Sequence, residues 1–309
     1  LCLLGFPRIH LYWRFCMACR LPRLVSLQLC FLILAWQACP WTKMSSSRCL
    51  APRLITLDST NTLLRLRKPV GELYLEQLRE VRGTDASAEV LEQRFGIALA
   101  RQSQRSPSFG AADDGCRAWW RTVVAETLEG ARMDDRDFEL IFQKLYDTFA
   151  GQEAWELFPH TKGALDSLRH WCDQNSCQLG VLSNMDDRLE AILQRLDIRD
   201  QFDFVLTSYA AGVEKPAPEI FETAQAIATA SGDGAPPIAP HQCLHCGDSM
   251  KRDLRGALHA GWSAAVLDST VTTAVMVDCS EDSGTAALAA EQSAWKLPDL
   301  SHLPGLLEE

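Results

Sequence analysis

Acidic residues are missing from the N-terminal region of this 309-residue chain. Residues 1–57 contain seven arginines and lysines but no aspartate or glutamate, whereas the whole chain has a net charge of −10. The acidic charge is therefore concentrated in the remaining residues. This argues against a nucleic acid as the main partner, because the acidic part of the chain would repel a polyanion. A small phosphate group held in a local pocket is still compatible with this charge.

Long apolar runs are also scarce at this end of the chain. The run Leu24–Trp36 has thirteen residues and contains Ser26 and Gln28, whereas a transmembrane helix needs about 20 apolar residues. Its length is closer to the apolar region of a signal peptide, and the arginines without acidic neighbours also fit a mitochondrial presequence. Membrane attachment is therefore expected only if residues 24–36 are kept as an anchor.

A further explanation concerns the start of the chain, which begins with Leu1 rather than methionine. Residues 1–43 differ from the rest in composition, and Met44 precedes a sequence typical of the start of a compact α/β domain. Residues 1–43 are then either a targeting segment or a translated upstream stretch, and we treat them as an atypical N-terminal extension. The protein is expected in the cytoplasm or the mitochondrion.

No regular spacing connects the twelve cysteines, which disfavours a disulfide framework and favours reduced thiols. Cys243 and Cys246 form a CxxC motif, with His241 and His245 nearby. On a strand, positions 243 and 246 point to opposite faces of the sheet. The two thiols therefore cannot converge on one zinc ion without a bend, and we expect no zinc site here.

The stretch Leu54–Leu64 places a carboxylate directly after an apolar run. This pattern predicts a buried parallel strand that ends in a functional loop at Asp58. In open α/β sheets, ligands bind at the carboxyl ends of the strands. A lone aspartate in such a position more often caps a turn, so the prediction depends on the strand ends that follow downstream.

Helical patterns without a strand among them follow the Asp58 loop. Apolar residues recur at helical spacing in four segments, and Asp134 and Asp135 are suitable N-terminal caps for the fourth. The segment Gln102–Gly115 is rich in polar and turn-forming residues and is predicted to be a loop. We expect a separate helical bundle inserted after the first strand. The apolar residues of the four helical segments lie within Val70–Val81, Leu91–Leu99, Trp119–Leu128 and Phe138–Phe149.

Helices and strands alternate from Pro159 onward. This alternation with short connections predicts βαβ units and a parallel sheet, so the fold class is α/β. Pro218 is placed as the first residue of a helix, and Gly261 as the residue that ends one. The predicted strands are Gln178–Asn184, Phe202–Thr207, Gln242–Cys246 and Ser263–Asp268, and the predicted helices are Thr161–Gln174, Arg188–Leu196, a helix from Pro218 and Asp253–Ala260.

Polar side chains follow four of the predicted strands, and parallel strands bring their carboxyl ends to one edge of a sheet. The set suits phosphoryl chemistry. A carboxylate can attack phosphorus, a lysine can offset the negative charge, and further carboxylates can hold Mg²⁺. These side chains are Asp58, Ser183 with Asn184, Lys215, and Asp248 with Asp253.

The same residues resemble the four motifs of the haloacid dehalogenase superfamily and occur in the same order. The resemblance covers about residues 50–270. It implies a Rossmann-like core from residues 50–66 and 153–270, a helical cap at 67–152 and a C-terminal tail at 271–309. The motifs are Asp58-x-Thr60-x-Thr62, Ser183-Asn184, Glu214-Lys215-Pro216 and Gly247-Asp248 with Asp253.

The resemblance also implies roles for these residues. Asp58 matches the nucleophile and a Mg²⁺ ligand, and Asp248 and Asp253 match further metal ligands. Thr60 matches the position that offers Mg²⁺ a backbone carbonyl. Gly247, at the end of the strand before Asp248, allows a close approach of the backbone. The phosphate is expected to contact Ser183, Asn184 and Lys215, of which the lysine balances charge.

Thr60 departs from the pattern of the family's phosphatases, which carry an aspartate there as general acid and base. Threonine cannot transfer a proton in this way at neutral pH, and general acid–base catalysis contributes roughly 10²–10⁴-fold in rate. Resemblance offers a precedent in the P-type ATPases, which also carry threonine and use a long-lived aspartyl-phosphate. The family's dehalogenases lack the second aspartate too, but they use no metal. Asp248 and Asp253 therefore favour phosphoryl chemistry.

Two functions remain open from the sequence. The first is a Mg²⁺-dependent hydrolase of a small phosphorylated metabolite, of the phosphatase class, with weak turnover because of Thr60. The second is a catalytically inactive protein of the same fold that binds a ligand or a protein through the old site or the cap. The cap is expected to move over the site about hinges near Lys68 and residues 152–158.

Overall fold

The computed structural model describes residues 51–129, 131, 133–231, 236–277 and 292–308. The extension 1–43, with its apolar run at 24–36, lies outside the described residues, as does part of the loop between Ser231 and Pro240. Within the described ranges, no helix combines the length and the apolar character needed to cross a bilayer.

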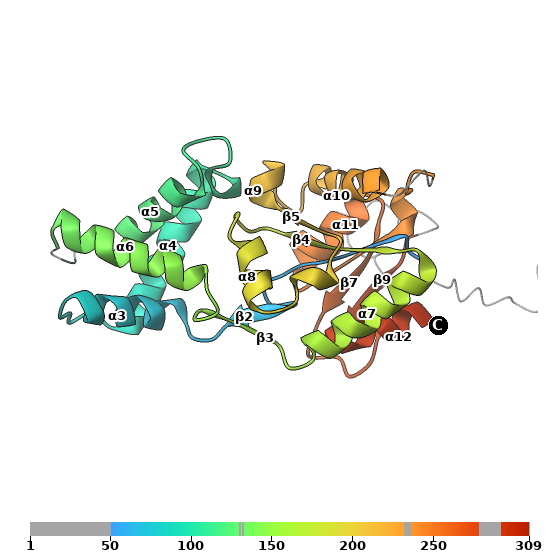
Figure 1. Ribbon diagram of the computed structural model, residues 1–309, viewed down its shortest axis with the longest axis horizontal. Coiled ribbons are helices and arrows are strands. Elements are labelled where there is room, and N and C mark those ends of the chain that lie inside the picture. The colour runs from blue at the N-terminus through green and yellow to red at the C-terminus, as the bar shows by residue number, and fades with distance from the viewer. Residues whose placement is uncertain (1–50, 130, 132, 232–235, 278–291, 309) are drawn as a thin grey trace, which may run out of the picture. The chain divides into compact units, whose positions relative to one another are not determined.

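Seven strands form one sheet in the order β5-β4-β1-β6-β7-β9-β8 (Figure 1). All neighbouring strands are parallel except β8 and β9, which are antiparallel. The first strand, β1, lies inside the sheet between β4 and β6, and the chain adds strands on both of its sides. This places a topological switch point beside β1, where ligands bind in such folds. The strands are β1 (Leu54–Leu57), β4 (Gln178–Ser183), β5 (Phe204–Thr207), β6 (Cys243–Gly247), β7 (Ser263–Leu267), β8 (Val275–Met276) and β9 (Ala294–Leu297).

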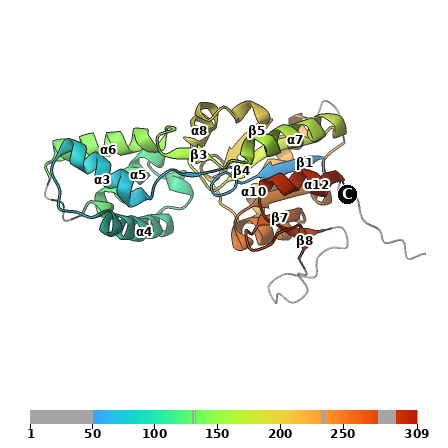
Figure 2. The same ribbon diagram turned by 90° about the horizontal axis from the view of Figure 1, so that it is seen from below.

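Helices cover both faces of the sheet (Figure 2). One hydrophobic cluster joins the sheet to α7, α8 and α12, and a second joins the opposite face to α10 and α11. Cys246 belongs to the first cluster and Cys243 to the second, as expected for two thiols on opposite faces of one strand. The helices are α7 (Thr161–Asn175), α8 (Leu189–Arg195), α9 (Ser208–Ala211), α10 (Pro218–Ser231), α11 (Gly256–His259) and α12 (Leu303–Glu308).

Four α-helices are inserted between the short strands β2 (Leu64–Leu66) and β3 (Trp155–Leu157), so the prediction of an α/β core with a helical insertion after the first strand is confirmed. Their apolar faces pack into a shared core. Asp134 caps the last of them by accepting a hydrogen bond from the Asp137 backbone N–H at 2.8 Å. The inserted helices, which we call the cap, are α3 (Val70–Val81), α4 (Ala88–Arg105), α5 (Cys116–Thr127) and α6 (Asp135–Phe149).

A short antiparallel ribbon lies where the chain leaves the core and where it returns. It consists of β2 (Leu64–Leu66) and β3 (Trp155–Leu157). Sequence analysis did not predict either strand, because three residues are too few to show alternation. It also placed the start of a loop at Gln102, whereas α4 continues to Arg105 and a 3₁₀ turn follows at Ser108–Gly110.

The C-terminal stretch 271–309, which shows little pattern in the sequence, contributes to the sheet. Its strand β9 pairs with β7 in parallel register, and β8 pairs with β9. The helix predicted over Asp253–Ala260 differs from the observed structure. A π-helical turn at Met250–Arg255 comes first, and the short α11 follows it. Gly261 ends this segment with a φ of 82°, in the left-handed region that glycine adopts without strain.

Candidate active site at the carboxyl ends of the central strands

Asp58 is the first residue after β1 and lies between the ends of β4 and β6. Its backbone N–H donates a hydrogen bond to the carbonyl oxygen of Cys246 at 2.9 Å, which extends the β1–β6 pairing by one residue. The side chain is buried. The parallel register thus brings Asp58 next to Ser183 at the end of β4 and Asp248 just after β6, as the sequence predicted.

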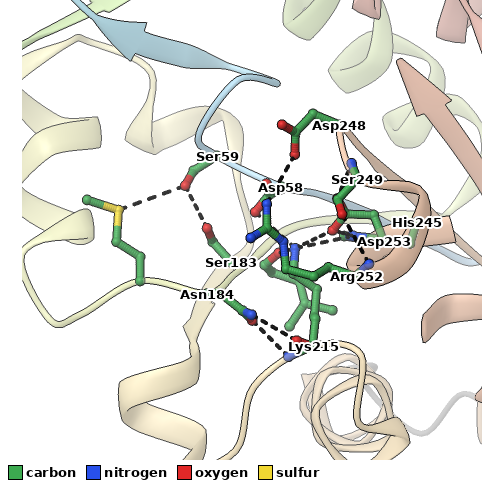
Figure 3. A network of polar contacts seen from close by, with 12 residues as sticks. Asp58, Ser59, Ser183, Asn184, Lys215, His245, Asp248, Ser249, Arg252 and Asp253 are labelled. Carbon is green, nitrogen blue, oxygen red and sulfur yellow. Dashed lines mark hydrogen bonds and ion pairs between the residues drawn. The ribbon is translucent and has the colours of Figure 1, made fainter. Parts of the chain in front are cut away.

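Lys215 reaches this point from the loop between α9 and α10, and its side chain is only 2% exposed. Its Nζ atom donates to Asp58 Oδ1 at 2.9 Å, to Asp253 Oδ1 at 2.7 Å and to the Leu182 carbonyl oxygen at 2.8 Å (Figure 3). An ammonium group has three protons, so these partners use all of them. Lys215 is therefore a buried bridge between two carboxylates and not a surface lysine.

The buried charges set the protonation of this cluster. Burial alone would lower the pKa of Lys215, but the charges of Asp58 and Asp253 outweigh it and raise the pKa above its ordinary value. Burial would likewise raise the pKa of Asp253, but the charge of Lys215 and the hydrogen bond from His245 hold it well below its usual range. Lys215 is thus protonated and Asp253 ionised at neutral pH.

His245 is part of the cluster, although sequence reasoning considered it only beside the CxxC motif. Its Nε2 atom lies 3.1 Å from Asp253 Oδ1, and its Nδ1 atom lies 2.8 Å from the Thr56 hydroxyl. Burial and the charge of Lys215 lower its pKa, so the ring is neutral. We assign its proton to Nε2, which donates to Asp253. The available signal was a histidine inside an otherwise apolar strand.

Three carboxylates converge on one point: Asp58, Asp248 and Asp253 each place an oxygen within 4.8 Å of the others. Asp248 Oδ1 is buried without a hydrogen-bond partner, while Oδ2 accepts from Asn61 Nδ2 at 3.1 Å. Burial, reinforced by the charges of the two neighbouring aspartates, raises the pKa of Asp248. The guanidinium of Arg252 lies 3.9 Å from Oδ1 of Asp248. An all-oxygen donor set with one oxygen free of hydrogen bonds fits a hard divalent cation such as Mg²⁺.

Gly247 makes the close packing behind this cluster feasible. A Cβ atom added there would lie 2.3 Å from Asp253 Cγ, closer than any real contact. The absence of a side chain lets Asp253 fold back toward the end of β6, where its Oδ2 accepts from the Ser249 backbone N–H at 2.8 Å. Both oxygens of Asp253 are thereby fixed in position.

Ser183 and Asn184 differ in what they contact. The Ser183 hydroxyl lies 2.7 Å from that of Ser59, beside Asp58. Asn184 instead binds the Lys215 backbone, donating from Nδ2 to its carbonyl oxygen at 2.9 Å and accepting from its N–H at 2.8 Å. Asn184 was predicted to contact phosphate; in the structure its side chain fixes the loop that carries Lys215.

Thr60 and Asn184 border a cavity of about 220 Å³ that extends between the cap helices and the core loops. The position two residues after Asp58 thus lines this cavity. Cap and core also share polar contacts there, since Trp120 Nε1 donates to Asp186 Oδ2 at 2.6 Å and Cys116 Sγ to Asp187 Oδ1 at 2.9 Å.

Known proteins with similar sequences share this architecture. A model of haloacid dehalogenase-like hydrolases matches residues 52–261. The protein named haloacid dehalogenase-like hydrolase domain-containing protein 3 is 38% identical in Bos taurus, over 68% of this chain and 79% of that protein. Its Mus musculus counterpart is 34% identical over 81% of this chain and 92% of that protein. The Rhythmically expressed gene 2 protein of Drosophila melanogaster is 30% identical, over 70% of this chain and 82% of that protein.

Solved structures show the same fold at lower identity. A 2-haloacid dehalogenase from Pseudomonas syringae has a TM-score of 0.56 at 23% identity, over 83% of this chain and 98% of that one. The putative HAD-hydrolase YfnB from Bacillus subtilis, bound to magnesium, has a TM-score of 0.57 at 16% identity, over 84% and 99%. With the family model covering most of the described core and cap, the chain belongs to the haloacid dehalogenase-like hydrolases.

Proposed function

We propose that this protein is a Mg²⁺-dependent hydrolase of a small phosphate monoester, with Asp58 as the nucleophile. The observation that carries the proposal is the arrangement around Asp58. Lys215 holds its Oδ1 atom and uses its other protons on Asp253 and Leu182. One carboxylate oxygen of Asp58 is thereby anchored, which leaves the other for attack on phosphorus.

The remaining residues bind the phosphoryl group and offset its charge. The Lys215 ammonium compensates part of the negative charge that the phosphate brings next to Asp58. The Ser183 hydroxyl, already beside Ser59, is placed to donate to a phosphate oxygen. Asp58, Asp248 and Asp253 would hold Mg²⁺, with the Thr60 backbone carbonyl as a further ligand by family resemblance. When bound, the ion supplies charge neutralisation at the phosphate oxygens.

Thr60 limits the rate in this scheme. Release of the alcohol requires a proton for the leaving oxygen, and hydrolysis of the aspartyl-phosphate requires removal of a proton from water. The threonine hydroxyl performs neither transfer at neutral pH. We therefore infer that phosphoryl transfer to Asp58 and its hydrolysis are both slow.

Substitution of Thr60 tests this inference. We expect Thr60→Asp to raise the turnover of a phosphate monoester by roughly 10²–10⁴-fold, the usual contribution of a positioned general acid and base. Thr60→Asn is the matched control, because asparagine has the shape of aspartate without its titratable proton. Steady-state phosphate release in the presence of Mg²⁺ measures both. Equal turnover of the two variants would contradict the proposed role of position 60.

The alternative is a binding module without catalysis, and Thr60 is the observation that favours it. In that case Thr60→Asp would leave turnover at the background rate even though Mg²⁺ and phosphate bind. Failure of the wild-type protein to bind Mg²⁺ would contradict the proposed hydrolase and leave only the binding module.

A further inference from the structure

The cavity between cap and core has apolar walls. Aromatic side chains from all four cap helices line it, among them Tyr74 of α3, Phe95 of α4, Trp120 of α5 and Phe142 of α6. Thr60, two residues after Asp58 in the chain, lines the same space. A substrate whose phosphate lies at Asp58 therefore places its leaving group among these aromatic rings.

Three of the four lining aromatic residues that carry a polar atom already use that atom within the protein. Trp120 Nε1 donates to Asp186 Oδ2 at 2.6 Å, and Trp155 Nε1 donates to a backbone carbonyl at 3.0 Å. The Tyr146 hydroxyl lies 3.4 Å from Cys116 Sγ. These contacts leave ring faces and edges, rather than free donors, for a bound group.

The two charged residues of the lining compensate each other. Arg188 forms a two-point contact with Asp186, from Nε to Oδ1 at 2.9 Å and from its terminal nitrogen to Oδ2 at 2.6 Å. The guanidinium also lies over the rings of Trp120 and Tyr146, 4.9 and 4.6 Å from their centroids. Asn184, a polar residue of the wall in addition to Thr60, holds the Lys215 backbone with both side-chain polar atoms.

We propose that the leaving group of the substrate is apolar and has about the size of a single ring with its linking carbon. This inference rests on the proposed function, since it names the class of phosphate monoester that the site takes. The volume supports the size, because an engineered apolar cavity of about 150 Å³ takes up benzene, and this one measures about 220 Å³. A sugar would bury several hydroxyls without partners, each weakening binding by roughly tenfold.

Three phosphate monoesters of matched chemistry test the inference on the full chain with Mg²⁺. Benzyl phosphate, cyclohexylmethyl phosphate and glucose 6-phosphate all release a primary alcohol from a six-membered ring, so they differ mainly in the polarity of that ring. We expect kcat/KM to be at least ~100-fold higher for the two apolar esters, given several unpartnered hydroxyls in the sugar. Equal values, or a preference for glucose 6-phosphate, would overturn the inference.

Cavity-filling variants test whether the preference for apolar esters arises from the cavity between cap and core. Val124 lines the cavity and is buried, and we expect Val124→Phe to lower kcat/KM for benzyl phosphate by more than ~10-fold, since phenylalanine would occupy the volume of the ring. Val90→Phe on α4 is the matched control, because Val90 is 42% exposed. Should Val124→Phe fail to fold by circular dichroism, Leu99→Phe fills the same cavity from a half-buried position. Loss in the control as well would contradict the assignment.

Binding of neutral alcohols separates this inference from the proposed function. Calorimetry with benzyl alcohol and glucose requires no phosphoryl chemistry. If benzyl alcohol alone binds but no ester is hydrolysed, the apolar site stands and the proposed phosphatase fails. If all esters turn over equally, the phosphatase stands and the apolar site fails. If neither alcohol binds and no ester is hydrolysed, both are wrong.

Discussion

Lys215 is the residue on which the site depends most. It lies between Asp58 and Asp253, and all three groups are buried. A buried ion pair adds little net stability compared with apolar residues, but removal of one partner leaves an uncompensated charge. Lys215 therefore affects both the stability of the folded chain and the position of the Asp58 carboxylate.

We expect Lys215→Met to lower the free energy of unfolding by about 3–5 kcal/mol, the usual cost of stranding a buried charge, and to abolish turnover. Urea unfolding followed by circular dichroism measures the stability. Lys162→Met on α7 is the control, because Lys162 is exposed and a surface change of this kind stays within about 0.5 kcal/mol.

The double variant Lys215→Met with Asp253→Asn provides a further check. Removing the charge of Asp253 should recover part of the lost stability, since one of the two stranded carboxylates is then neutral. A double variant whose loss equals the sum of the two single losses would show that the pair is not coupled and would contradict the buried bridge.

At this scale, sequence reasoning selected residues whose side chains lie close together in the structure. Asp58 and Asp248 directly follow β1 and β6. Lys215 was expected at a strand end but lies in the loop between α9 and α10, and Asp253 lies in the π-helical turn Met250–Arg255. The fold nevertheless brings these side chains together.

Sequence reasoning missed His245, because a histidine within an apolar strand gives no indication of what it faces. It also did not predict the hydrogen bonds between the Asn184 side chain and the Lys215 backbone. Such a contact depends on loop conformation, which no local sequence pattern encodes.

At the scale of elements, the strand β9 is linked to its neighbour β7 by a side-chain contact as well as by backbone pairing. The Lys296 Nζ atom of β9 donates to Asp268 Oδ2 at 2.9 Å, just after the end of β7. Hydrogen bonds from Thr270 and from Lys296 lower the pKa of Asp268 to about 2. This contact links the C-terminal stretch to the strand beside it.

The lowered pKa predicts how acid affects this link. A carboxylate with a depressed folded pKa stabilises the protein above its unfolded pKa, and this contribution is lost as the pH falls through the folded value. We therefore expect Asp268→Asn to be less stable than wild type at pH 7, by a margin that is constant down to about pH 5 and narrows below about pH 4. Urea midpoints across this range measure the margin.

The control for net charge is Asp200→Asn, which removes an exposed carboxylate elsewhere on the surface of the α/β domain. A margin for Asp268→Asn that widens in acid would mean that the carboxylate is not held by Lys296, and β9 would lose the contact that links it to β7.

Elements with a long regular pattern were predictable and short ones were not. The four cap helices and the strands β1, β4, β5, β6 and β7 follow apolar periodicity, because one face or both faces are buried. The strands β2 and β3 have three residues each, and β8 has two. Their existence depends on the partner strand, so the signal lies in tertiary structure.

At the scale of the whole described molecule, the cap follows β1, the loop at Asp58 and the short strand β2. The outgoing and returning segments run as the pair β2–β3, and Arg67 Nε donates to the carbonyl oxygens of Gln152 and Trp155, both at 2.9 Å. The predicted hinges near Lys68 and residues 152–158 fall at this place. A cap joined in this way sets the walls of the cavity, while the core sets the chemistry at its base.

Binding of beryllium fluoride with Mg²⁺, measured by calorimetry on wild type and on Asp58→Asn, tests the proposed phosphoryl site most directly. Beryllium fluoride mimics a phosphoryl group on an aspartate, so its binding reports the nucleophile and the metal ligands without requiring turnover. We predict Mg²⁺-dependent binding by the wild type and its loss in Asp58→Asn. Absence of binding by the folded wild type would contradict a phosphoryl site at Asp58 and leave the cluster as structure at the edge of the sheet.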